Sequence, residues 1–468
     1  MTGWGAILDG FDIIVREATL LAACGFLIGG IDDLAVDTVF LVRSLVARRG
    51  IHASHGALLA DFPVGDAPGK IAIFVAAWDE SAVIGQMIRH TLATFDYPNY
   101  ALYVGVYPND RATIDAAATA AIDDPRVRIV IGANDGPTTK ADCLNSLWRA
   151  LRREERDGEP IKAIVLHDSE DMVHRGELRV FDRLIGRYSV VQLPVMPLVD
   201  PRGRFVSGHY CDEFAEAHGK ALVVRQALGA ALPLAGVGCA IARAALGKLA
   251  ERRGDAPFDA DSLTEDYELG LYLGELGGRG VLARVREYRG GPLVAVHAYF
   301  PCDIGAAVRQ KARWMTGIAL AGWDRVGWSR WRNWREHWMR MRDRRAPLGV
   351  LILVTAYIAL LGWGASLLLH AAIGRPAPAP SDAARLILWI NGLLLAWRLA
   401  MRAVMTGSAY GWRGALASMP RLLVSNVIAM LAARRAMIRY VALLRGGAVS
   451  WEKTAHAFPE VGQTGIAA

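Results

Sequence analysis

Short apolar runs that each stop at polar residues recur between residues 70 and 170. Four such runs are recognisable: 71–77, 100–107, 127–131 and 163–167. Residues 81–94, between the first two, have the apolar spacing of a helix. Buried strands that alternate with helices predict an open, mostly parallel α/β sheet. Ligands bind beyond the carboxyl ends of such strands, so Asp79, Asp110 and Asp168, which follow three of the runs, are expected to converge in one crevice.

Longer apolar stretches lie on both sides of this region. Residues 13–46 predict a membrane helix whose three central aspartates lie near one interface or face protein. Residues 347–370 and 384–406 are almost continuous hydrocarbon, and about 20 such residues cross a bilayer. Residues 414–444 are apolar but bracketed by arginines. A full membrane span there would place these arginines on the outer side of the membrane, against the preference of positive residues for the cytoplasmic side. We therefore interpret this segment as amphipathic or re-entrant on the cytoplasmic side. Residues 323–345, dense in Trp and Arg, predict an interfacial helix.

These patterns divide the 468 residues into five segments. They are an N-terminal membrane helix (1–47), an α/β domain (48–320), an interfacial Trp/Arg-rich helix (321–346), C-terminal membrane helices (347–445) and a cytoplasmic tail (446–468). With 53% apolar side chains, the composition excludes a disordered chain and, given the membrane stretches, a wholly soluble protein. The excess of 53 Lys+Arg over 46 Asp+Glu sits beside the apolar runs, which favours a membrane surface over nucleic acid as partner.

The strongest chemical motif is the acidic cluster Asp168-Ser169-Glu170-Asp171 at the end of the fourth apolar run. Adjacent carboxylates at a buried strand end repel one another, and a hard divalent ion such as Mg²⁺ or Mn²⁺ would relieve that repulsion. A solvated acidic turn that opens the next helix explains the same residues equally well. His167, at the end of the strand, is expected to be a satisfied core histidine rather than a ligand.

Two further motifs are weak by themselves. Thr264-Glu265-Asp266 has the composition of a helix start with Thr264 as the N-cap. In Gln310-Lys-Ala-Arg313-Trp314, residues 310 and 314 share one helical face and could line a sugar or a stacked base. Arg313 could meet a phosphate in a bidentate way.

In this order the motifs resemble those of the inverting membrane glycosyltransferases of family two, which include the cellulose, hyaluronan and chitin synthases. The resemblance covers roughly residues 70–320 and implies a GT-A nucleotide-diphospho-sugar transferase domain, flanked by transmembrane and interfacial helices. Within the family the chain looks most like the bacterial phage-adsorption protein B group. Residues 167–174, 235–239 and 451–456 carry that closer match.

The resemblance assigns roles to individual residues. It implies nucleotide-sugar binding by Asp79, Glu80, Asp110, Lys140, Gln310, Arg313 and Trp314. It implies metal binding by Asp168 with Glu170 or Asp171, base catalysis by Asp266 with Glu265 beside it, and acceptor binding by Gly236, Gly238 and Trp314. A tight loop that enters a helix explains the two glycines equally well. The family's usual Pro-x-Asn-Glu here reads Ala76-Ala-Trp-Asp79-Glu80, and Glu170 stands where the family's metal-binding pair has a second Asp.

The resemblance implies a multi-pass protein of the bacterial inner membrane with its catalytic domain in the cytoplasm. It would transfer a sugar, with inversion, from a UDP-hexose or UDP-N-acetylhexosamine to a growing surface glycan or exopolysaccharide, using Mg²⁺ or Mn²⁺. An export partner in the periplasm or outer membrane is expected. Two alternatives remain open: transfer of a single sugar to a lipid carrier, and a non-catalytic membrane scaffold or phage-receptor component. The Asp-x-Glu replacement favours the scaffold, and the presence of Asp266, Gln310 and Arg313 counts against it.

Overall fold

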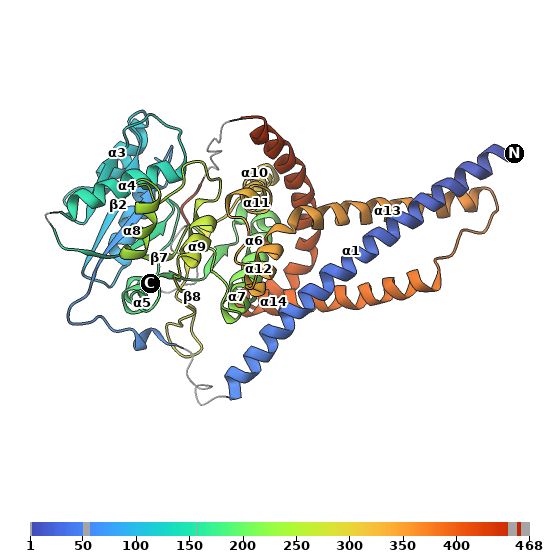
Figure 1. The fold of residues 1–468 in the computed structure, drawn as a ribbon, viewed down its shortest axis with the longest axis horizontal. Helices are drawn as coiled ribbons and strands as arrows, with labels where there is room; N and C mark the ends of the chain where they lie inside the picture. Colours follow the sequence, from blue (N-terminus) through green and yellow to red (C-terminus); the bar gives the residue numbers. More distant parts are fainter. Residues whose placement is uncertain (1, 50–56, 157, 448–455, 460–468) are drawn as a thin grey trace.

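A seven-stranded sheet runs through the larger part of the molecule (Figure 1). The computed structural model describes residues 2–49, 57–156, 158–447 and 456–459. The strands follow the order β3-β2-β1-β4-β7-β5-β8. Their bounds are β1 (Lys70–Ala76), β2 (Tyr100–Val106), β3 (Val127–Ile131), β4 (Ile161–His167), β5 (Val190–Gln192), β7 (Cys239–Ala242) and β8 (Gly280–Leu282). β7 is antiparallel to β4 and β5, and the other pairs are parallel. β6 (Val195–Leu198) and β9 (Val296–Tyr299) form a second, parallel pair.

Helices cover both faces of the sheet because its central strands are apolar on both sides. In β1, Ile73 and Val75 pack into one core and Phe74 into the other. The first core is closed by α2 (Ile84–Thr94), α3 (Arg111–Ala121) and α5 (Glu177–Leu184). The second is closed by α4 (Lys140–Glu154), α8 (Arg243–Arg252) and α9 (Glu265–Glu275). The predicted open α/β sheet is therefore confirmed.

Long apolar helices extend away from this unit (Figure 1). α1 (Thr2–Arg49), α13 (Ala346–Ala372) and the first part of α14 (Asp382–Leu444) lie side by side. Within the described residues, these three helices are long and apolar enough to cross a membrane. Large apolar side chains on the outside of these helices are exposed: Leu368 is 74% exposed and Trp389 is 75% exposed. The aspartates of α1 face protein, as one of the two expectations had it, because Asp33 pairs with Arg342 and Arg345 at 2.9 and 2.5 Å.

α14 bends at Gly411, which has φ +76°, and its second part runs along the α/β unit (Figure 1). There it packs on α6 (Arg204–Glu216) and α10 (Ile304–Trp314). Buried Asp212 of α6 joins Arg402 at 3.2 Å and Arg421 at 3.1 Å, one arginine from each side of the bend. Of the arginines that argued against a full span over 414–444, Arg421 thus has a protein partner, and the number of spans stays a prediction.

The expected single helix over 323–345 is wrong. Two helices replace it, α11 (Gly322–Arg325) and α12 (Trp334–Arg344), separated by a turn in which Gly327 has φ +58°. Trp331 is 81% exposed, as a membrane-surface residue would be, but Trp338 donates its indole N–H to Asp32 of α1 at 2.6 Å. The remaining elements are α7 (Leu222–Ala227), two π-helical turns (Ala217–Ala221 and Met315–Ala321) and two 3₁₀ turns (Leu59–Asp61 and Pro201–Gly203).

Candidate active site

One polar cavity opens where β1 and β4 end and where α4, α9 and α10 approach them. Most of the predicted site residues line it: Glu80, Lys140, Asp168, Glu170, Asp171, Glu265, Asp266, Gln310, Arg313 and Trp314. The first and the last of them, Glu80 and Trp314, are separated by about half of the chain. The fold therefore brings together residues that lie far apart in the sequence. Asp79, Asp110, Gly236 and Gly238 are not among the residues that line this cavity.

Lys140 and Asp168 form an ion pair in this cavity. Lys140 is the first residue of α4, and Thr139 before it caps the helix by accepting the Asp142 N–H at 3.2 Å. Burial by itself would raise the pKa of Asp168, but the charge and hydrogen bond of Lys140, with help from Arg313, hold that pKa below its ordinary value. Asp168 is therefore an anion, and Lys140 keeps its charge near Glu265 and Asp266 as well.

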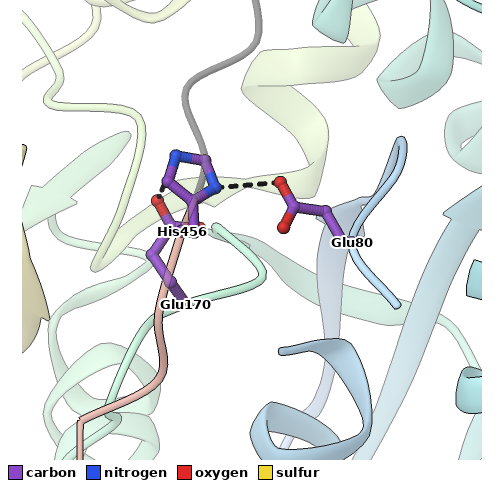
Figure 2. A group of neighbouring side chains, drawn as sticks. All are labelled: Glu80, Glu170 and His456. Carbon is purple, nitrogen blue, oxygen red and sulfur yellow. Dashed lines mark hydrogen bonds and ion pairs between the residues drawn. The ribbon is translucent and has the colours of Figure 1, made fainter. Parts of the chain in front are cut away.

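Glu170 and Asp171 play different structural parts. Asp171 Oδ2 lies 2.9 Å from His167 Nδ1 and accepts the Asp168 N–H at 3.0 Å. His167 Nε2 lies 2.6 Å from Glu177, so the expected core histidine is confirmed as satisfied on both nitrogens. Glu170 instead points toward Glu80 and His456 (Figure 2). Burial, together with Asp168 and Asp171, raises the pKa of Glu170 to about 8. Of the two acids, Glu170 therefore faces other side chains of the cavity, whereas Asp171 is bonded to His167 and to the Asp168 backbone.

Asp266 lies in the first turn of α9 and accepts the Tyr267 N–H at 2.7 Å. Burial and the neighbouring Glu265 carboxylate raise its pKa to about 7, against the opposing effect of Lys140. A carboxyl group with a pKa near neutrality is well matched to general base catalysis. Thr264 stands at the N-cap as predicted, but its side chain makes no capping bond, and its buried hydroxyl packs against Gly317.

α10 presents Gln310, Arg313 and Trp314 to the cavity, as the shared helical face predicted. The Gln310 Oε1 and Arg313 Nε atoms are buried and have no hydrogen-bond partner among the described residues. A buried polar atom without a partner costs about 1–3 kcal/mol, so a pair of them at one cavity wall indicates a place for a polar ligand. Trp314 packs edge-on against Tyr210, with ring centres 6.1 Å apart.

Asp110 supports the cavity from behind. Its carboxylate accepts the Asp79 N–H at 2.5 Å and the Thr113 N–H at 3.2 Å, which caps α3. The Glu80 N–H donates to Thr113 Oγ1 at 2.9 Å. Asp79 has φ +53°, a conformation that these two neighbouring bonds hold. The structure thus gives Asp110 a direct part in shaping the loop that carries Glu80.

The two glycines before β7 differ from each other. Gly236 has φ +76°, and a Cβ there would lie 2.5 Å from Asp266 Oδ2, so its lack of a side chain makes room for the carboxylate. Gly238 has φ +55° and packs against Val296 and Leu193. Gly238 does not line the cavity, and its acceptor contact stays a prediction.

His456 is the cavity residue that sequence reasoning missed. Its Nδ1 lies 2.8 Å from Glu80 Oε1 and its Nε2 3.3 Å from Glu170 Oε1 (Figure 2). The donor atoms of these three residues all lie within 4.8 Å of one another, close enough to hold one metal ion. The motif 451–456 carried the family resemblance and was the available signal, but residues 451–455 lie outside the described part of the chain.

Residues 68–317 match the family model described as "Glycosyltransferase like family 2". The chain belongs to this family, and its fold is the GT-A class with added long apolar helices. It is 32% identical over 459 residues to the bacteriophage adsorption protein B of Escherichia coli (strain K12). The bacteriophage N4 adsorption protein B of Escherichia coli O157:H7 matches equally well. The alignment covers 93% of this chain and 61% of each relative, so the chain spans less than two thirds of their length.

Among solved structures, the chain is similar to a mannosyltransferase from Pyrobaculum calidifontis in complex with GDP-Man and Mn²⁺. That match has 16% identity and a TM-score of 0.49 and covers 87% of this chain and 99% of the other. Glucosyl-3-phosphoglycerate synthase from Mycobacterium tuberculosis matches with 18% identity and a TM-score of 0.35. It covers 59% of this chain and 85% of the other.

Proposed function

We propose that this protein transfers a sugar from a UDP-sugar to a glycan acceptor with inversion, at the inner face of the bacterial inner membrane. The observation that carries the proposal is the shared cavity, in which Asp168, Asp266 and Arg313 meet although they come from three different elements. Together they supply an anionic metal position, a base and a phosphate-binding cation. Family membership adds that such a cavity belongs to a glycosyltransferase domain.

The donor would bind with its pyrophosphate between Asp168 and Arg313. A divalent cation, Mg²⁺ or Mn²⁺, held by Asp168 and Glu170 would neutralise charge on the phosphates. Arg313, whose Nε has no partner among the described residues, would donate to the same phosphates, and Lys140 would add a second positive charge. Trp314 and Gln310 would then line the sugar.

Asp266 would act as the general base. It accepts the proton of the acceptor hydroxyl while that oxygen forms its bond to the anomeric carbon. The bond between this carbon and the phosphate oxygen breaks, and UDP leaves with the electron pair. Because attack and departure are on opposite faces, an α-linked donor gives a β-linked product. With a pKa of about 7, about half of the Asp266 carboxyl groups are in the basic form at neutral pH.

The apolar helices α1, α13 and α14 would hold the cavity beside the membrane, where the acceptor is a growing surface glycan or a lipid-linked sugar. Three helices make a thin channel, so passage of a long glycan would need an export partner or further copies of the chain.

The test is a nucleotide-release assay on the full chain in detergent. A panel of UDP-sugars, with GDP-sugars alongside, is supplied with Mn²⁺ and a glycan primer, and the released nucleotide is measured, with Asp266→Asn as the inactive control. We expect UDP release with one sugar of the panel and not in the variant. Product length on a gel separates chain extension from single-sugar transfer. Release of GDP from a GDP-sugar in place of UDP would overturn the donor assignment, and intact nucleotide binding without release would favour the scaffold.

A further inference from the structure

The chain returns to the catalytic cavity after its last long helix. His456 lines the cavity, and Phe458, two residues on, packs against the core on the α2 side of the sheet. The rings of Phe458 and His90 meet edge-on with centres 5.7 Å apart, and Pro459 is buried. Residues 456–459 are therefore docked on the catalytic domain, and His456 is fixed in the cavity by the packing that follows it.

The imidazole of His456 bridges two carboxylates from distant segments (Figure 2). Glu80 stands on the loop after β1, and Glu170 on the loop after β4. The Glu80 loop is held by its own backbone bond to Thr113, and the Glu170 carboxylate accepts the Ser169 hydroxyl at 3.2 Å. One ring nitrogen serves each acid: Nδ1 lies nearer to Glu80 and Nε2 nearer to Glu170.

This arrangement has the form of a metal-ligating histidine. Such a histidine gives one nitrogen to the metal and donates the other N–H to a carboxylate, which fixes the tautomer and the ring plane. Here Glu80 takes the orienting position on Nδ1. Nε2 and Glu170 then face the same point, within the 4.8 Å that the three donor atoms span.

We propose that His456 is a ligand of the divalent cation in the donor site, together with Glu170, and that Glu80 positions its imidazole. The proposal for His456 rests on the proposed function in one respect, the presence of a divalent cation in the donor site. Glu80 is then a positioning residue of the metal site, whereas the family resemblance gave it to the nucleotide. A mixed nitrogen and carboxylate site favours Mn²⁺ over Mg²⁺, because Mg²⁺ is bound almost wholly through oxygen and Mn²⁺ lies higher in the affinity order for nitrogen ligands.

The experiment uses the full chain in detergent with Mn²⁺ as the only added ligand. Pulsed electron paramagnetic resonance detects ¹⁴N coupling to bound Mn²⁺, and titrations give the Kd for Mn²⁺ and, by competition, for Mg²⁺. In the wild type we expect ¹⁴N coupling and tighter binding of Mn²⁺ than of Mg²⁺. In His456→Gln we expect the coupling to disappear, the Mn²⁺ Kd to rise by at least about 10–100-fold, and the Mn²⁺ preference to shrink.

Three variants separate ligation from structure. His337→Gln, on α12 and outside the cavity lining, should leave all three readouts unchanged. Glu80→Gln should weaken Mn²⁺ binding by about 10-fold but keep the ¹⁴N coupling at saturation, because the imidazole remains. Phe458→Ala, which removes the anchor of the tail, should behave as Glu80→Gln does.

Persistence of ¹⁴N coupling in His456→Gln would overturn the proposal. So would tighter Mn²⁺ binding in that variant, since it would mean that the imidazole competes with the cation. Failure of the proposed function gives a different pattern: Mn²⁺ bound with ¹⁴N coupling, but no nucleotide released from any sugar.

Discussion

The rate of sugar transfer should depend on pH through Asp266. Its folded-state pKa is raised to about 7 by burial and by the adjacent Glu265 carboxylate. Because the unprotonated carboxylate is the base, activity is present above this pKa and is lost as the pH falls through it. The basic fraction is about one tenth at pH 6 and about nine tenths at pH 8, so kcat/KM, which reports the free enzyme, should rise by about 10-fold over that interval.

The assay is the initial rate of UDP release at substrate concentrations well below KM, which gives kcat/KM, measured from pH 5.5 to 8.5. Two variants tie the profile to its cause. Glu265→Gln removes a neighbouring negative charge and should move the midpoint to lower pH. Asp266→Asn should lower kcat by about 10²–10⁴-fold at every pH while the protein unfolds at the same temperature. A flat wild-type profile between pH 6 and 8, or a midpoint that Glu265→Gln leaves unmoved, would refute this reasoning.

Three further outcomes are expected. Gly236→Ala should lower kcat by up to about 10²-fold, because its Cβ would displace the Asp266 carboxylate. Gly229→Ala should leave kcat unchanged, because Gly229 has a similar positive φ but open space around it. Steady-state kinetics of the two variants checks this. Asp212→Ala should lower the free energy of unfolding by about 3–5 kcal/mol, since it removes the carboxylate partner of buried Arg421 and leaves Arg402 with Glu216 alone at 3.4 Å, and denaturant unfolding in detergent measures the loss. Chelation by EDTA should abolish UDP release and added Mn²⁺ should restore it; release that continues in EDTA would contradict a metal-assisted departure.

The central strands were predictable because they are fully buried. The apolar run over 71–77 became β1 at Lys70–Ala76, and the run over 100–107 became β2 at Tyr100–Val106, which is buried at every residue. The three- and four-residue strands such as β5 and β8 were not predicted, since so short a run gives no periodicity to read. In α14, Arg421, one of the arginines that argued against a membrane span over 414–444, pairs with Asp212 of α6, a partner that sequence spacing cannot reveal.

The candidate site shows the same division. Acids directly after strands, Asp168 and Glu170, were found because strand ends converge in an α/β sheet. Asp266 and Arg313 were found through the order of motifs in a family. His456 was not assigned a role, because the motif 451–456 that contains it does not tie it to a carboxylate 376 residues earlier. Only the docking of Phe458 on the core brings it there.

The central claim is that acids from separate elements gather around one divalent cation to hold a nucleoside diphosphate. Equilibrium binding of UDP to the full chain, with Mn²⁺ and with EDTA, tests it most directly in the wild type and in Asp168→Asn. We predict that Mn²⁺ strengthens UDP binding in the wild type and that this gain is lost in the variant. UDP binding of equal strength with Mn²⁺ and with EDTA, or an undiminished gain in Asp168→Asn, would contradict the account.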